Sequence, residues 1–301
     1  MSRLLHTGQV IVDLVMALDT LPATGGDVLA QSASFEAGGG FNVMAAARRN
    51  GLPVVYLGRH GNGRFGDLAR ASMQAEGVEM AQPASTDKDT GLCVSLTEAT
   101  TERTFISHIG AEGDLSADDL ARVTPQPGDY VYVSGYSLLL EGKAQALLEW
   151  VVALPREINV VFDPGPLVKA PDSALMVALL PRIDIWTSNG PEALAFTGAR
   201  TLADALGELK RHLPEGALLV VRDGPKGCWV NADHVPGFKV IAVDSNGAGD
   251  AHAGVFVAGL AAGLAPVQAA RRANAAAALA VTRWGPATSP GSAEVDALLT
   301  E

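Results

Sequence analysis

A run of small residues followed by a carboxylate stands late in the chain, at Gly247, Ala248 and Gly249. An apolar, strand-like stretch over residues 238–243 precedes it, and a pattern typical of a long helix follows. The first amides of a helix have no partner within it and carry the positive end of its dipole, so they can hold an anion. Asp250 comes next. A carboxylate there repels an anion, but it can deprotonate a hydroxyl that attacks a phosphoryl group held by those amides. A plain helix start, with Asp250 as a dipole partner, is equally compatible with the motif alone.

Three consecutive glycines, at 38–40, mark a second place of interest. Glycines destabilise the interior of an element, so such a cluster indicates that something approaches the backbone closely. Asn42 follows at the start of a predicted helix, and its amide offers a donor and an acceptor to a sugar hydroxyl. A flexible turn with a helix cap is the structural alternative, and the motif alone slightly favours it.

Two weaker signals lie between these sites. Asn189 and Glu192 have the spacing of a capping box, although they could also orient water around a magnesium ion bound to phosphates. Arg222 and Lys226 flank a glycine-containing turn after an apolar strand. At the carboxyl edge of a parallel sheet, that turn could meet a nucleotide phosphate.

One motif points to a different class of protein. Gly61, Gly63 and Gly66 fit GxGxxG between a strand pattern and a helix pattern, and Glu79 and Asp87 lie at loosely suitable distances for a ribose partner. An NAD-dependent oxidoreductase is therefore a rival hypothesis. It leaves the other glycine sites unexplained, and neither acidic residue ends a convincing second strand. A catalytically silent sugar- or nucleotide-binding regulator is a further alternative.

Composition and missing motifs narrow the choice further. The net charge of −11 on 301 residues, with no basic run, argues against nucleic acid and anionic membranes as partners. The sequence contains no GxxxxGK[ST], GxSxG or HExxH, which excludes a Walker-type phosphate loop and gives no support to a hydrolase elbow or a zinc site. Cys93 and Cys228 lie far apart and form no CxxC, so we expect reduced thiols and a cytoplasmic protein. Asp13 interrupts the first apolar stretch and no small-residue cleavage site follows, so we expect no signal peptide.

Short apolar strands alternate with helical patterns along most of the chain, which predicts a parallel sheet covered on both faces. Strands are expected at 54–57, 130–133, 159–162, 183–186 and 217–221, and helices at 43–50, 65–76, 143–154, 173–180, 191–196 and 202–212. Residues 10–36 and 90–110 break this rhythm with strands that have no helix between them. We expect one α/β domain over 1–301 with a small second sheet from these two segments, suited to a lid or a dimer contact.

Several motifs stand in a characteristic order, namely Asp13, Gly38 to Asn42, Gly58 to Gly66, Asp163-Pro-Gly-Pro, Asn189 with Glu192, Arg222 to Gly227, and Asp244-Ser-Asn-Gly-Ala-Gly-Asp250. This order, over about residues 4 to 290, resembles the ribokinase-like (phosphofructokinase-B type) carbohydrate kinases. The resemblance implies a three-layer α/β/α domain with a small β-sheet lid. It also implies transfer of the γ-phosphoryl group of ATP to a sugar-type hydroxyl with Mg²⁺, and a homodimer through the lid.

The resemblance also implies roles for individual residues. The catalytic base and anion hole correspond to Asp250, Gly247, Ala248 and Gly249. The substrate hydroxyls correspond to Asp13, Gly38, Gly39 and Asn42. Magnesium, phosphate and nucleotide contacts correspond to Asn189, Glu192, Arg222, Gly224, Lys226, Gly227 and Asn274. A monovalent cation, K⁺ in many members, corresponds to Asp244, Gly285 and Ser289. The usual Thr is Ser245 here, and Phe41 replaces a smaller residue beside the sugar position. A nucleoside kinase of the same family is the alternative within this class.

Overall fold

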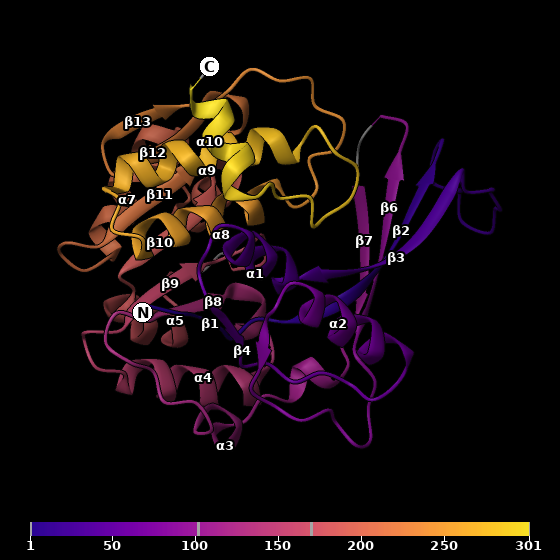
Figure 1. The fold of residues 1–301 in the computed structure, drawn as a ribbon, viewed down its shortest axis with the longest axis horizontal. Helices are drawn as coiled ribbons and strands as arrows, with labels where there is room; N and C mark the ends of the chain where they lie inside the picture. The colour runs from indigo at the N-terminus through magenta and orange to yellow at the C-terminus, as the bar shows by residue number, and fades with distance from the viewer. Residues whose placement is uncertain (1, 101–102, 169–170, 301) are drawn as a thin grey trace.

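The computed structural model describes residues 2–100, 103–168 and 171–300. Its main body contains a nine-stranded sheet in the order β13-β12-β11-β10-β9-β8-β1-β4-β5 (Figure 1). The strands are β1 (Leu4–His6), β4 (Val54–Tyr56), β5 (Glu79–Met80), β8 (Tyr130–Ser134), β9 (Asn159–Asp163), β10 (Ile185–Asn189), β11 (Leu218–Arg222), β12 (Gly227–Val230) and β13 (Asp233–Pro236). Neighbours from β11 to β5 are parallel, and β12 and β13 pair antiparallel at one edge. The predicted mostly parallel α/β sheet is confirmed.

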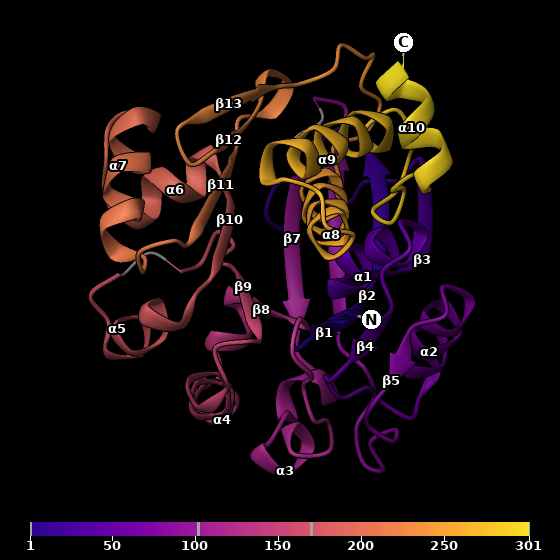
Figure 2. The same cartoon turned by 60° about the vertical axis from the view of Figure 1, so that its left-hand side comes forward.

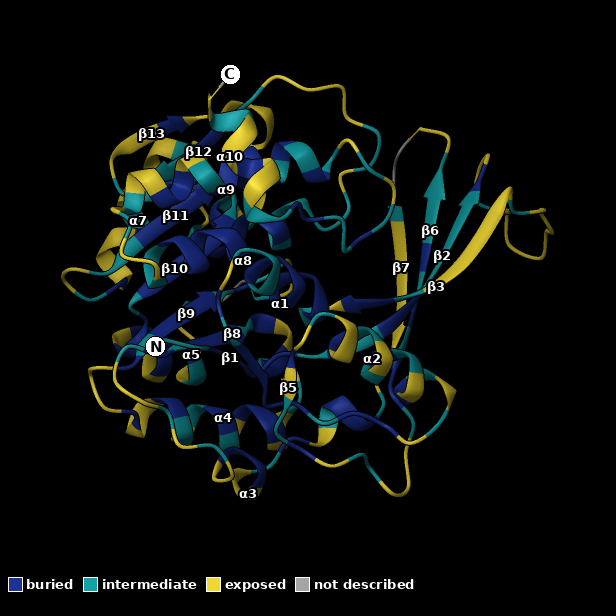
Figure 3. Ribbon diagram, in the orientation of Figure 1, coloured by how far each residue is buried: buried dark blue, intermediate teal, exposed yellow. Residues whose placement is uncertain are grey.

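Helices cover both faces of this sheet, which gives three layers (Figure 2). One face carries α1 (Gly40–Arg49), α2 (Arg64–Ala75), α8 (Ala248–Ala261), α9 (Pro266–Ala280) and α10 (Ser292–Thr300). The other carries α3 (Ala117–Leu120), α4 (Glu141–Ala153), α5 (Ala174–Leu179), α6 (Gly190–Thr197) and α7 (Leu202–His212). Short 3₁₀ turns are η1 (Ala111–Asp114), η2 (Gly135–Leu138), η3 (Leu180–Arg182) and η4 (Gly224–Lys226). Burial follows the layers, with buried strands between helices exposed on their outer sides (Figure 3).

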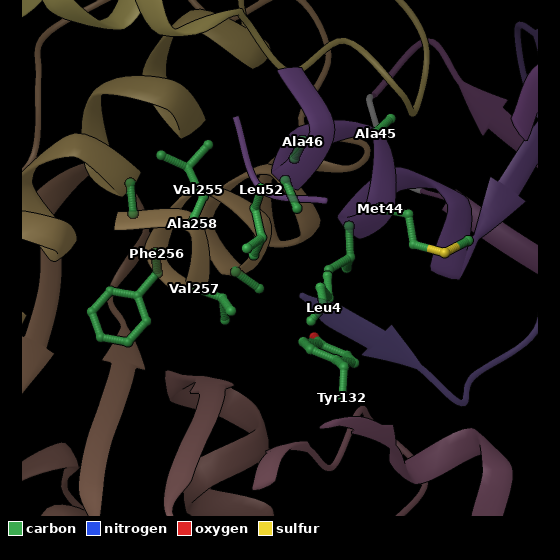
Figure 4. Close-up of a cluster of buried hydrophobic side chains, with 14 of the residues drawn as sticks. Leu4, Met44, Ala45, Ala46, Leu52, Tyr132, Val255, Phe256, Val257 and Ala258 are labelled. Carbon is green, nitrogen blue, oxygen red and sulfur yellow. The ribbon is translucent and has the colours of Figure 1, made fainter. Parts of the chain in front are cut away.

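The core between α1 and α8 decides where the polar side chains at their N-termini lie (Figure 4). Met44 and Phe256 are fully buried there. A Cβ at Gly254 would come within 2.4 Å of the Val43 carbonyl oxygen, so only glycine permits the two helices to approach this closely. The apolar and small residues of both helices therefore hold their first turns beside each other.

A second, smaller sheet stands beside the main body (Figure 1). It consists of β2 (Val10–Leu18), β3 (Ser32–Gly39), β6 (Leu92–Glu98) and β7 (Arg103–His108), in the order β3-β2-β6-β7. We call it the small sheet. The two segments predicted at 10–36 and 90–110 do come together in it, although residues 101 and 102 of the second segment lie outside the described residues.

The two faces of the small sheet differ in chemistry. Residues opposite each other in register point to the same face, so the row through Asp13 shares its face with Glu36 on β3 and with Ser107 on β7. The alternate row, through Leu14, places Phe35 and Ile106 on the opposite face, together with several half-buried apolar side chains. Those are Leu14, Met16, Leu92, Val94 and Leu96.

The GxGxxG turn packs against the residues that lead into the small sheet, Asp89 and Thr90. A Cβ at Gly61 would lie 2.1 Å from the Thr90 nitrogen, and one at Gly63 would lie 2.4 Å from a carboxylate oxygen of Asp89. The Asp89 carboxylate accepts hydrogen bonds at 2.7–3.1 Å from the backbone N–H groups of Gly63, Phe65, Gly66 and Thr90. The chain's own carboxylate thus occupies the position that a pyrophosphate would need, and the dinucleotide hypothesis is wrong.

Some local predictions are also wrong. Residues 238–243 form no strand, because Pro236 and Gly237 end the sheet, and the amide of Val243 instead donates to the Val281 carbonyl at the end of α9. The strand predicted at 183–186 lies two residues later. Glu79 does belong to a strand, although it is a two-residue one.

Both cysteines are buried and free, as expected. Among the described residues, no helix combines the length and the apolar character needed to cross a bilayer.

Candidate functional site

The site is assembled where the parallel strands of the main sheet end. Asp163, Asn189 and Arg222 are the last residues of β9, β10 and β11, and register pairs Asn189 with Arg222. Because the carboxyl ends of parallel strands meet at one edge, the three side chains share a neighbourhood. The N-terminus of α8 and the base of the small sheet adjoin the same edge.

The start of α8 has the geometry expected of an anion hole. Gly247 caps the helix in a left-handed conformation with φ 70°, and a Cβ there would lie 1.7 Å from the Pro286 carbonyl oxygen. Only glycine meets both conditions. Within the described part of the chain, no hydrogen bond is recorded from the amides of Gly247 and Gly249, and both residues are partly exposed. These amides can therefore receive an anion.

Asp250 lies in the first turn of α8, and its carboxylate accepts a hydrogen bond of 3.0 Å from the Asn42 amide. Asn42 is a buried residue in the first turn of α1, so the close packing of the two helices brings this pair together. Burial raises the pKa of Asp250 to about 6, against the lowering effect of the Asn42 hydrogen bond. The structure thus unites two predicted site residues that are far apart in sequence.

Asp13 enters from β2 of the small sheet. A Cβ at Gly38 would lie 2.0 Å from its Oδ2, so the glycine makes room for this carboxylate. Burial, together with the nearby charges of Asp250 and Glu36, raises the pKa of Asp13 to about 7. Asp13, Asn42 and Asp250 therefore lie near one another, and Gly39 turns the chain from β3 into α1 at φ 62°.

Arg222 is the principal cation of the site. Its guanidinium donates to the Thr187 hydroxyl at 2.7 Å and lies 3.6 Å from the carboxylate of Asp163 and 3.7 Å from that of Glu192. A Cβ at Gly249 would lie 3.5 Å from its Nε, which places the guanidinium against the first turn of α8. This cation offsets part of the carboxylate charge and can also bind phosphate.

Asn189 and Glu192 form the capping box of α6, with both reciprocal hydrogen bonds at 2.8 Å. The structural interpretation of this pair is therefore confirmed. Burial and the neighbouring Asp163 raise the pKa of Glu192 above its usual value. A cation near the carboxylates of Glu192 and Asp163 would reduce the repulsion between them, and Mg²⁺ prefers such oxygen ligands.

The predicted nucleotide-side residues that follow Arg222 lie in η4, at the start of β12 and on α9. Gly224 and Gly227 both have positive φ, and Lys226 between them is exposed and 3.5 Å from Asp223. Asn274 is buried, and its amide donates to two carbonyls of β13, at 3.0 and 3.2 Å. Those bonds tie α9 to β13, and a contact of Asn274 with nucleotide stays a prediction.

The three residues predicted for a monovalent cation also lie together in part. The Asp244 carboxylate accepts hydrogen bonds from the amides of Asn246 at 2.9 Å and Gly285 at 3.1 Å. The hydroxyl of Ser289 is buried without a hydrogen-bond partner among the described residues. An unpartnered buried oxygen suits a cation ligand.

Sequence reasoning assigned no role to Asp163, at this edge, or to Arg49, at the other end of α1. Asp163 is the last residue of β9, and its carboxylate accepts a hydrogen bond of 3.1 Å from the Tyr132 hydroxyl. Its place directly after a buried strand was the signal that could have identified it. Arg49 donates to the carbonyls of Ala287 and Ser289 at 2.8 Å and pairs with Glu76, because the end of α1 packs against the loop at 287–289.

Comparison with known proteins agrees with this geometry. The family model described as pfkB family carbohydrate kinase matches residues 1–292. An uncharacterised sugar kinase of Escherichia coli (strain K12), YegV, is 30% identical over 295 residues, covering 96% of this chain and 91% of its own. The ribokinase of Haemophilus influenzae is 27% identical over 294 residues, covering 94% and 93%. The structure of a putative ribokinase II of E. coli in complex with ATP and Mg²⁺ superposes with a TM-score of 0.83 at 23% identity, covering 100% and 99%.

Proposed function

Since this chain belongs to the pfkB family of carbohydrate kinases and is a phosphotransferase, we propose that it transfers the γ-phosphoryl group of ATP to a hydroxyl of a small sugar or sugar-like substrate. The observation that carries the proposal is the start of α8. There the free amides of Gly247 and Gly249 adjoin a carboxylate, Asp250, whose pKa of about 6 suits a base at neutral pH. The small sheet brings Asp13 to the same place.

In the proposed reaction, Asp13 and Asn42 bind acceptor hydroxyls and orient one of them toward Asp250. The Asp250 carboxylate takes the proton of that hydroxyl while its oxygen forms a bond to the γ-phosphorus. The bond from this phosphorus to the bridging oxygen of ATP breaks, and ADP leaves. The amides at 247–249 and the Arg222 guanidinium stabilise the charge on the transferred group.

Magnesium fits the acidic side of the site. Glu192 and Asn189 would hold it, directly or through water, and Asp163 contributes further negative charge. When bound, the ion neutralises phosphate charge and orients the triphosphate. The capping box uses one lone pair on an oxygen of Glu192 and one on the side-chain oxygen of Asn189. The remaining lone pairs of these two side chains are available to magnesium or its water ligands.

A monovalent cation, K⁺ by analogy with the family, would be held by Asp244 and Ser289 near Gly285. The unpartnered Ser289 hydroxyl supports this assignment. Such an ion would supply a fixed positive charge beside the anion hole.

The substrate is a neutral polyhydroxy compound in this proposal. Asp13, Glu36 and Asp250 place negative charge on the acceptor side. The charges of Asp250 and Glu36 are close enough to raise the pKa of Asp13. A phosphorylated or carboxylated acceptor would be repelled there. A nucleoside is the alternative acceptor, because it also presents ribose hydroxyls.

The small sheet would act as a lid and as a dimer contact. Its face bearing Asp13 would exclude water from the acceptor, which limits hydrolysis of ATP. Its opposite face exposes Phe35 (47%) and Ile106 (62%) among apolar neighbours, and a second copy of the chain would cover it.

The test is ADP release from ATP with Mg²⁺ across a panel of neutral sugars, sugar acids, sugar phosphates and nucleosides. We expect substrate-dependent release with one or more neutral sugars, and a higher melting temperature with ATP and Mg²⁺ but not with NAD. Release with nucleosides alone would favour the alternative acceptor. Binding of ATP without turnover on any acceptor would contradict the proposal.

A further inference from the structure

Arg103 connects the small sheet to the loop that leads into the anion hole. It is the first residue of β7, and its guanidinium lies 3.5 Å from Oδ1 of Asp244 and donates to the hydroxyl of Ser245. The side chains of Arg103 and Asp244 are 17% and 13% exposed. Exposed ion pairs contribute little to stability, but this pair is largely buried and joins segments 141 residues apart.

Register places Arg103 on the same face of the small sheet as Asp13. Arg103 pairs with Thr97, which pairs with Ala17, and Ala17 lies four residues from Asp13 on β2. Residues an even number apart on a strand point to the same side. The face that presents Asp13 to the acceptor therefore also carries the contact to the phosphate side.

Asp244 in turn organises the anion hole. One of its carboxylate oxygens accepts a hydrogen bond from the backbone N–H of Asn246, and the other accepts one from the backbone N–H of Gly285. The carbonyl of Pro286, next to Gly285, packs directly against Gly247. The carboxylate thus holds together both segments that set the conformation of the helix start.

Asp244 also has an electrostatic consequence. It places a negative charge three residues before Gly247, where a triphosphate would be bound, and an unpaired carboxylate would repel that ligand. The guanidinium of Arg103 offsets this charge while the small sheet lies against the body of the protein.

We propose that Arg103 is a positioning residue that couples the small sheet to the anion hole. This inference rests on the proposed kinase function. By binding Asp244 and Ser245, Arg103 holds the acceptor over Asp250 at the moment when the loop at 244–247 has its phosphate-binding conformation. Phosphoryl transfer to the acceptor is thereby favoured over transfer to water.

The experiment compares the wild-type chain with Arg103→Ala, Arg103→Lys and a charge-matched control. The control is Arg211→Ala, which removes an exposed ion pair with Glu208 on α7. For each protein we would measure the melting temperature, ADP release with ATP and Mg²⁺ at fixed high K⁺, and hydrogen exchange of the peptide over 244–250. ADP release is followed with the best acceptor of the panel and with water alone.

We expect Arg103→Ala to lower kcat by about 10²-fold, the scale of a small misplacement of reacting groups. The share of ATP that is hydrolysed rather than transferred should rise, and the 244–250 peptide should exchange faster. Arg103→Lys keeps the charge and should restore part of each property, whereas Arg211→Ala should match the wild type.

The inference would be overturned if Arg103→Ala changed neither the share of ATP that is hydrolysed nor the hydrogen exchange of the 244–250 peptide. A lower kcat with unchanged exchange would also overturn it, since Arg103 would then act by touching substrate. If the wild-type chain phosphorylates nothing, the proposed function fails instead. The exchange measurement on the free protein still decides whether Arg103 orders the loop.

Discussion

At Asp250, burial and hydrogen bonding act on the same carboxylate in opposite directions. Burial raises its pKa to about 6, and the hydrogen bond from Asn42 lowers it. The charge of Asp250 also contributes to the raised pKa of Asp13, which is about 7. In the proposed reaction the ionised form of Asp250 is the base, so kcat/KM should fall as the pH falls from about 7 to below 6.

Replacing Asn42 with Ala tests the direction in which the pKa of Asp250 shifts. The substitution removes the hydrogen bond that lowers the pKa of Asp250, so the acid limb of the kcat/KM profile should move to higher pH. The position of the limb is the readout, because its height also reflects acceptor binding. A limb that stays in place or moves to lower pH would contradict the assigned base.

Gly38→Ala tests the role of Asp13. The new methyl group would overlap the Asp13 carboxylate, 2.0 Å away, and push it from its position. We expect the KM for the acceptor to rise at least tenfold, with little change in the KM for ATP. Gly207→Ala is the matched control, since nothing lies within 4 Å of its Cβ and it sits inside α7. It should stabilise the protein by about 0.5–1 kcal/mol and leave both KM values unchanged. Equal effects of the two substitutions would refute the assignment.

At this scale the sequence predicted the residue types well and their partners poorly. Gly247 to Asp250 could be identified because free amides and an adjacent carboxylate carry a chemical meaning by themselves. The contact of Asn42 with Asp250 could not, because it depends on the packing of α1 against α8. Asp244 shows the same limit, since two of its partners, Gly285 and Arg103, come from distant segments.

At the scale of elements, Asp89 joins α2 to the base of the small sheet. Burial raises the pKa of Asp89, but its four backbone N–H partners outweigh burial and leave the pKa below the usual value. A lowered pKa stabilises the fold above the unfolded-state value of about 4, and this contribution is lost as the pH falls through the folded-state value.

Asp89→Asn should therefore destabilise the protein at neutral pH, by about 1–2 kcal/mol, as for the loss of a helix cap. The difference in melting temperature from the wild type should shrink below about pH 4. Asp87→Asn is the control, because Asp87 is exposed and bonds only to the nearby Ser85 hydroxyl among the described residues. A difference that persists or grows at low pH would contradict this account.

Most elements could be predicted because their periodicity is local. The helix at 202–212 and the strands within 10–36 and 90–110 agree with the sequence pattern. The stretch at 238–243 has the same apolar character but no strand to pair with. The GxGxxG turn was ambiguous for a related reason, since the same glycines can admit a ligand or, as here, another part of the chain.

At the scale of the whole molecule, the apolar face of the small sheet predicts self-association. Ile106→Glu places a charge on the β7 side of that face, so it should convert a dimer to a monomer in light scattering. Val177→Glu, on an equally exposed residue of α5, should leave the oligomeric state unchanged. A wild-type protein that is monomeric at high concentration would rule out the dimer contact.

The layered architecture itself followed from the alternation of strands and helices, because parallel strands need helical crossovers. What the pattern could not give is how the small sheet meets the body. Arg103 looked like an ordinary polar residue next to a turn, and only the fold brings it to Asp244.

The measurement that tests the central claim most directly is phosphoryl transfer by Asp250→Asn, with ATP binding measured on the same sample. Removal of a positioned base should lower kcat by about 10²–10⁴-fold. The affinity for ATP with Mg²⁺ should stay within a few-fold of the wild type, because the amides at 247–249 and Arg222 remain. An Asp250→Asn protein that transfers phosphate within a few-fold of the wild-type rate would contradict the account.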